Sequence, residues 1–236
     1  MIITNDNESH KENLLRLFNE ADEIIFASGF LKNSGLNNIK EVLIEFCKDK
    51  RKKSTFYIGI GFGETDPKTL ESLNNIIKSK VNHQLILCTP DAGIFHSKIY
   101  VFRKSRNITI VIGSANLTEA GWLTNDEVST ITETTIDSID YQQLLKYFSR
   151  LHKSYYTHQV LELILKYKLQ LEQFRDKNSQ KPTFRFRRKE TTIDGIDMPR
   201  LKNYYENYLK SKEFIEPLER EEQYIKAKEH LDILGS

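Results

Sequence analysis

The sequence predicts an α/β fold, in which helices flank both faces of a mixed β-sheet and a helical, charged C-terminal extension follows. First, short apolar runs alternate with helix-like stretches between residues 22 and 90, a pattern typical of a largely parallel sheet covered on both faces. Second, two apolar runs, 97–102 and 107–114, are joined by four polar residues. So short a link indicates an antiparallel hairpin, and the sheet is therefore mixed.

The individual elements follow from local patterns. Apolar and β-branched residues gather into expected strands at 22–30, 54–63, 83–90, 97–102, 107–114 and 126–132. Helices are expected at 34–49, 66–80, 138–156 and 157–177. The second of these has clear start signals, because Asp66 is a suitable N-cap and Pro67 occupies the first helical position.

The chain is expected to divide near residue 155. Residues 1–155 hold the alternating pattern and form the first domain, and residues 156–236 form the helical, basic extension. The charged helical part at 199–234 has narrow apolar faces. We therefore expect this part to pack against another surface, which is the first domain, a partner subunit or a further domain.

A basic run, KPTFRFRRK at 181–189, carries five positive charges in nine residues. Phe184 and Phe186 are interleaved with Arg185, Arg187 and Arg188, an arrangement that suits contact with a phosphate backbone and stacking on bases. These arginines are candidate nucleic-acid contacts. A solvated strand edge explains the run equally well.

Composition restricts the class of protein. The net charge is +2, so overall charge identifies no partner. Cys47 and Cys88 are the only cysteines, which argues against a disulfide framework or a zinc cluster and favours a reducing, cytoplasmic setting. Residues 1–15 do not resemble a signal peptide, and no apolar run reaches the roughly 20 residues that span a bilayer. We therefore expect no membrane partner.

Polar residues are predicted to meet around the hairpin. His96 and Lys98 alternate on a strand and so share one face. The second strand of the hairpin ends in Gly-Ser-Ala-Asn, and a turn there offers backbone N–H groups to an anion. Lys98 adds a positive charge, while Ser114 and Asn116 add neutral hydrogen-bonding groups. The set suits a phosphate, with His96 as nucleophile or acid–base group.

A nucleophilic imidazole also needs an acceptor for its second nitrogen, which fixes the tautomer. Asp126 and Glu127 are the nearest carboxylates downstream, and Asn125 lies beside them. All three lie at the start of a strand that we expect near the hairpin.

The order His96-x-Lys98, Gly113-Ser114-x-Asn116 and Asn125-x-Glu127 resembles the signature of the phospholipase D superfamily. It is most similar to the nuclease branch with one motif copy per chain, which includes the phospholipase-D-type restriction endonucleases, over roughly residues 20–155. The resemblance implies a phospholipase D-like sheet, cleavage of DNA with no metal or other cofactor, and one active site shared by a homodimer of this domain. A restriction or anti-phage role follows by analogy.

The resemblance also implies residue roles. The matching His96 is the nucleophile and forms a phosphohistidine, while the same histidine of a second copy protonates the leaving oxygen. Lys98 and Asn116 bind the phosphate with Ser114 close by, and Glu127 orients His96. Because one histidine must be neutral and the other protonated, we expect a bell-shaped pH profile and one active site per dimer.

Arg103 departs from the family pattern, which has an aspartate five positions after the lysine, and the spacing from Lys98 to Gly113 is longer than usual. The aspartate is structural support in the family. Because the aspartate is replaced here, one alternative function is a catalytically inactive module that binds nucleic acid. A phospholipase or phosphatidyltransferase is the other, although the single motif and the lack of an amphipathic anchor argue against it.

The remaining polar features have plainer interpretations. The glycines of YIGIGFGET at 57–65 favour a tight strand-to-helix turn over a phosphate loop. Trp122 is expected to pack under the hairpin turn. The other histidines show no ligand spacing, so surface or capping positions are expected for His10, His83, His152, His158 and His230.

Overall fold

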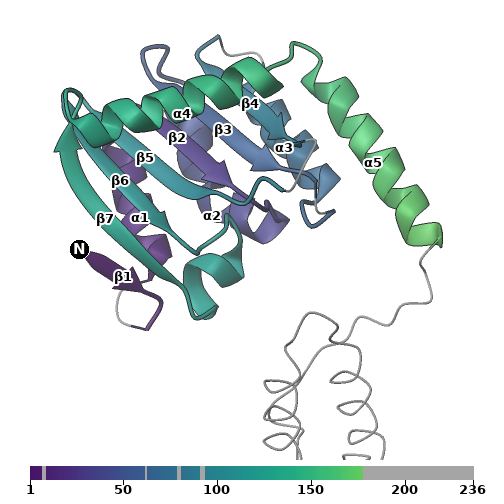
Figure 1. The fold of residues 1–236 in the computed structure, drawn as a ribbon, viewed down its shortest axis with the longest axis horizontal. Coiled ribbons are helices and arrows are strands. Elements are labelled where there is room, and N and C mark those ends of the chain that lie inside the picture. Colours follow the sequence, from purple (N-terminus) through teal and green to yellow (C-terminus); the bar gives the residue numbers. More distant parts are fainter. Residues whose placement is uncertain (7–8, 62, 79–80, 91–93, 178–236) are drawn as a thin grey trace, which may run out of the picture. The chain divides into compact units, whose positions relative to one another are not determined.

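The structure is a computed structural model that describes residues 1–177, except 7–8, 62, 79–80 and 91–93 (Figure 1). The expectations for residues 178–236 lie outside the described residues. These include the basic run with Arg185, Arg187 and Arg188, the charged helical part and His230.

Within the described residues, seven strands form one sheet in the order β1-β7-β6-β5-β2-β3-β4. The strands are β1 (Ile2–Thr4), β2 (Glu23–Ser28), β3 (Lys53–Gly59), β4 (His83–Cys88), β5 (Lys98–Lys104), β6 (Asn107–Gly113) and β7 (Val128–Thr135). Strands β2, β3 and β4 are parallel, whereas β5 is antiparallel to β2 and starts an antiparallel series through β6, β7 and β1. The expected mixed sheet is confirmed.

Helices cover both faces of this sheet. They are α1 (His10–Glu20), α2 (Asn33–Phe46), α3 (Pro67–Ile77), a π-helical turn η1 (Ala120–Thr124), α4 (Ile139–Tyr155) and α5 (Val160–Lys177). Helices α1, α2 and α3 lie behind the sheet in the view of Figure 1, and α4 crosses its front. The predicted fold class is therefore confirmed for the described part of the chain.

The two faces follow from strand alternation, because successive side chains point to opposite sides of a sheet. In β2, Ile24 and Phe26 belong to the core shared with α1–α3, whereas Ile25 and Ala27 belong to the core under α4. Phe26 is central to the first core, since its ring makes edge contacts with Phe18, Phe56, Tyr100 and Phe102 at centroid distances of 5.0–5.6 Å.

Helix boundaries agree with their capping signals. The Asp66 side chain accepts a hydrogen bond from the Lys68 N–H, and Pro67 begins α3, as expected. At α1, which we did not predict, the Ser9 side chain accepts from the Glu12 N–H. Ser-x-x-Glu before an apolar stretch is a recognised start signal, so the sequence does carry evidence for α1.

The first compact unit runs from Met1 to Asn178 and so passes the expected boundary at residue 155. The physical reason is the packing of α5, whose Ile164, Tyr167 and Leu171 are buried in the core shared with α3. The Tyr167 hydroxyl also donates a hydrogen bond to the Thr65 carbonyl at 2.8 Å. Among the described helices, none has the length and apolar character needed to cross a membrane.

Candidate active site

The predicted site residues meet at one edge of the sheet. Because β5 is antiparallel to both β2 and β6, the end of β2, the start of β5 and the end of β6 lie at the same edge. Strand β7 is antiparallel to β6, so its start lies there too. This topology brings His96, Asn116 and Glu127 to one edge from three separate segments of the chain.

Gly29, directly after β2, lies between His96 and Asn116. A Cβ atom at Gly29 would lie 3.0 Å from Cδ2 of His96 and 3.2 Å from Oδ1 of Asn116. Both distances are tight for a real side chain. The missing side chain at Gly29 therefore lets the histidine and the asparagine converge.

The orientation of Asn116 is fixed by the backbone after β2. Its Oδ1 accepts a hydrogen bond from the Phe30 N–H at 3.1 Å and lies 3.4 Å from Oγ of Ser28. An amide has an acceptor oxygen and a donor nitrogen, and the oxygen is occupied by these contacts. The amide nitrogen is thereby left to donate, which suits a phosphate oxygen.

Lys98 is largely buried, with 8% of its surface exposed. Its Nζ donates to the His96 carbonyl at 2.9 Å and lies 5.9 Å from the centre of the Phe30 ring. Burial lowers the pKa of Lys98, and the negative charge of Glu127 opposes that shift. The ammonium group is thus held beside the histidine at a fixed place.

The His96 side chain is exposed at this edge and contacts the Phe30 ring edge-on, with centroids 5.3 Å apart. Burial and then the positive charge of Lys98 lower the pKa of His96. Both effects favour the neutral imidazole, which is the form that carries a lone pair for attack.

Glu127 does not hydrogen-bond to the His96 ring within the described residues of one chain. Its carboxylate instead accepts from the Asn125 side-chain amide at 3.2 Å. It lies close enough to Lys98 to affect the pKa of that ammonium group. The orienting role of Glu127 therefore stays a prediction.

Ser114 is tied to the neighbouring strand. Its hydroxyl accepts from the Val128 N–H at 3.1 Å and donates to the Val128 carbonyl at 3.4 Å. The preceding residue, Gly113, packs so closely on β7 that a Cβ atom there would lie 2.0 Å from Oγ of Ser129. Ser114 is exposed at the same edge, and these bonds fix its position.

His10, expected at a surface or capping position, is fully buried behind this edge. Its Nδ1 lies 2.7 Å from Oδ1 of Asn5, and its Nε2 lies 2.9 Å from Oγ of Ser129. The Asn5 amide nitrogen donates to the carbonyls of Gly121 and Asn125, so its oxygen must be the acceptor. The network therefore assigns the proton to Nδ1 and the acceptor role to Nε2.

This network holds the segment that carries Asn125 and Glu127. Burial lowers the pKa of His10, with the charge of Glu127 opposing the shift, which agrees with a neutral ring. Sequence reasoning missed the network because the partners of His10 lie 5 and 119 residues away and share no local pattern.

The structure also places the remaining described histidines and Trp122. His83 is also buried, at the start of β4 with Nδ1 2.8 Å from Oγ of Ser54, so the expected surface or capping position was wrong for it. His158 is exposed, and His152 is half-buried and stacks on Tyr156. Trp122 is buried and packs edge-on against Tyr100, which lies on the hairpin.

No group of three metal-ligating side chains occurs among the described residues.

Comparison with known proteins identifies the family of this chain. Residues 12–163 match the family model described as the NgoFVII restriction endonuclease N-terminal PLD domain, where PLD stands for phospholipase D. The chain belongs to this family. It is therefore a phospholipase-D-type nuclease domain, a phosphodiester hydrolase. No curated protein matches the chain.

Two solved structures share the fold of this nuclease domain. NucT from Helicobacter pylori is 16% identical, with a TM-score of 0.52 over 66% of this chain and 96% of NucT. Nuc from Salmonella typhimurium, a phospholipase D family member, is 19% identical, with a TM-score of 0.50 over 66% of this chain and 95% of Nuc. At these identities the likeness shows the fold alone.

Arg103, which replaces the motif aspartate of the phospholipase D family, lies at the far end of β5. It pairs with Glu23 across the β2–β5 ladder, with Nη2 and Oε2 3.0 Å apart. Five residues of strand separate it from Lys98, or about 17 Å. Arg103 therefore lies well away from His96, Lys98 and Asn116.

Replacing Arg103 with alanine is expected to leave phosphodiester cleavage within about twofold of the wild-type rate. The ion pair with Glu23 is partly exposed, so its loss should lower the free energy of unfolding by no more than about 1 kcal/mol. Lys98→Ala, at the other end of the same strand, is the matched control and should reduce cleavage about 100-fold. Equal losses in the two variants, measured as cleavage rates alongside urea denaturation, would contradict this interpretation.

Proposed function

We propose that this chain is a metal-independent endonuclease that cleaves DNA through a phosphohistidine on His96, with one active site per homodimer. The convergence of His96 and Asn116 at Gly29, with the Lys98 ammonium group hydrogen-bonded to the His96 carbonyl, carries the proposal. Those groups supply a nucleophile, a positive charge and a neutral donor within one short stretch of surface. A restriction or anti-phage role agrees with the family to which the chain belongs.

In the first step, a nitrogen of the neutral His96 ring attacks phosphorus. The N–P bond forms, the P–O bond to the leaving oxygen breaks, and the partner's His96 gives that oxygen a proton. Lys98 and the Asn116 amide bind the non-bridging oxygens, where negative charge develops. In the second step, water attacks phosphorus, the N–P bond breaks, and the partner's His96 takes the proton from the water.

The proposed mechanism needs two histidines, and among the described residues of one chain only His96 is exposed at this edge. A second copy is therefore part of the proposal. An apolar patch beside the site supports this: Ile112, Val128 and Ile2 are 45%, 53% and 69% exposed. The strand register places all three on the sheet face that carries α4, and Val128 follows Glu127 directly. Exposed apolar side chains of this kind are typical of a protein interface.

Plasmid cleavage in EDTA tests the proposed chemistry. The wild-type protein should cleave plasmid DNA in excess EDTA, and His96→Ala should lose at least about 1000-fold in rate because it removes the nucleophile. His158→Ala, at an exposed histidine away from the site, is the control and should retain full activity. Cleavage that requires a metal, DNA binding without cleavage, or choline release from lipid would each contradict the proposal.

The pH dependence of cleavage should be bell-shaped. Burial and Lys98 lower the pKa of His96, so the neutral nucleophile persists to lower pH and the acid limb should fall below pH 6.5. The basic limb reports loss of the proton from the second histidine. A rate that rises and then stays level with pH would contradict the two-histidine mechanism, as would active-site titration that finds two independent sites per dimer.

Ile112→Glu is expected to separate the dimer and to abolish cleavage together with it. A carboxylate buried without a partner at an interface costs several kcal/mol. Ile139→Glu, an equally apolar-to-charged change at the far end of the sheet where α4 begins, should leave the dimer intact. Sedimentation analysis checks the mass, and circular dichroism checks the fold. A folded Ile112→Glu monomer with wild-type activity would refute the shared site.

A further inference from the structure

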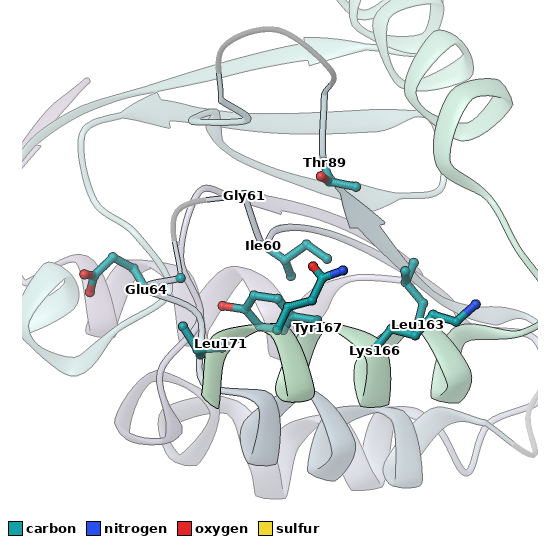
Figure 2. Close-up of a pocket in the computed structure, with 10 residues that line it drawn as sticks. Ile60, Gly61, Glu64, Thr89, Leu163, Lys166, Tyr167 and Leu171 are labelled. Atoms are coloured by element: carbon teal, nitrogen blue, oxygen red, sulfur yellow. The ribbon is translucent and has the colours of Figure 1, made fainter. Parts of the chain in front are cut away.

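A pocket of about 570 Å³ lies between helix α5 and the segments that follow β3 and β4 (Figure 2). In Figure 2, Leu163, Tyr167 and Leu171 extend from α5, while Ile60 and Thr89 face them from the strand ends. Gln170 completes the set of neutral lining side chains. The site described above uses none of these residues.

The pocket adjoins the candidate active site through the backbone. Gly59 ends β3, and a Cβ atom there would lie 2.6 Å from the Gly29 carbonyl oxygen and 2.8 Å from the Phe95 carbonyl oxygen. Phe95 directly precedes His96, and Ile60, the first pocket residue, directly follows Gly59. Neighbouring strands lie about 4.8 Å apart, so the backbone at Ile60, where the pocket begins, lies roughly two strand spacings, about 10 Å, from the start of β5.

The residues that line the pocket indicate which kind of ligand it can bind. Ile60, Leu163 and Leu171 supply apolar surface, and the Thr89 hydroxyl and the Gln170 amide can each donate and accept hydrogen bonds. The charged residues of the lining already have partners. Glu64 pairs with Lys32 at 3.1 Å, and Lys166 pairs with Glu162 at 2.7 Å. A neutral ligand with apolar faces and polar edges therefore fits better than a phosphate or a metal ion.

We propose that this pocket receives one unstacked nucleobase of the substrate, one or two nucleotides from the scissile phosphate. The proposal rests on the nuclease function proposed above and adds a substrate preference to it. Taking a base out of a duplex costs a few kcal/mol, and least where the base is mismatched or single-stranded. Cleavage should therefore favour single-stranded or distorted segments over regular duplex.

The test fills the pocket and leaves the active site unchanged. Leu163→Trp places a large ring in the pocket, and Leu161→Trp, at a 52% exposed position of α5 outside the pocket, is the matched control. Each is assayed on a single-stranded oligonucleotide and on bis(p-nitrophenyl) phosphate, a phosphodiester without a base. We expect Leu163→Trp to lose about ten- to hundredfold in kcat/KM on the oligonucleotide, as for loss of one base-stacking site, and less than about twofold on the small diester.

The outcomes separate this proposal from the nuclease function. If the wild-type protein hydrolyses neither substrate, the nuclease proposal fails and the base pocket fails with it. If both are hydrolysed and Leu163→Trp cleaves the oligonucleotide as fast as Leu161→Trp does, the base pocket alone is overturned.

A second variant covers the case in which Leu163→Trp disturbs α5 and loses both activities. Gln170→Leu keeps the size of the side chain and removes its polar edge. It should change the preference among the four bases at one position near the cut, read from cleavage of oligonucleotides randomised there. Two results together would overturn the proposal. Gln170→Leu would show the base preference of the wild-type protein, and the wild-type protein would cleave oligonucleotides that lack a base at any one flanking position as fast as the intact oligonucleotide.

Discussion

The antiparallel pairing of β2 with β5 is the constraint on which the candidate site depends. Strands β2, β3 and β4 are parallel, and their carboxyl ends lie at one edge of the sheet. Because β5 runs the other way, its first residues reach that edge, and His96 lies there two residues before Lys98, the first residue of β5. A parallel β5 would carry Lys98 to the opposite edge, and no local change could then bring it to Asn116.

Close backbone approach is the second requirement at this edge. Gly29 admits His96 and Asn116 on either side, and Gly59 packs against the carbonyls of Gly29 and Phe95. Side chains at these positions would force the strand ends apart by a few tenths of an ångström or more. The same two glycines thus set the geometry around the histidine and bring the neighbouring pocket within reach of it.

Much of this arrangement could be predicted from local patterns, because strand alternation, helix caps and a short hairpin link are encoded by neighbouring residues. His96 and Lys98 were placed together for that reason, and the structure has Lys98 as the first residue of β5 with His96 two positions before it. Contacts made across the sequence were not accessible in this way. The burial of His10 depends on Asn5 and Ser129, the packing of α5 extends the first compact unit past residue 155, and the pocket joins residues such as Ile60 and Leu163.

The hydrogen-bond network of Asn5 and His10 joins residues far apart in the sequence and therefore also affects how the domain folds. The chain start pairs with β7, and the Met1 amino group donates to the Ile131 carbonyl across 130 residues of sequence. Contacts of such long separation require closure of a large loop before they contribute, and they slow folding. The parallel half of the sheet can assemble from nearby segments, but the edge that carries Glu127 must wait until β7 has been synthesised and has met the first residues. The edge that carries the candidate site therefore depends more than the rest of the sheet on synthesis of the whole segment from β1 to β7.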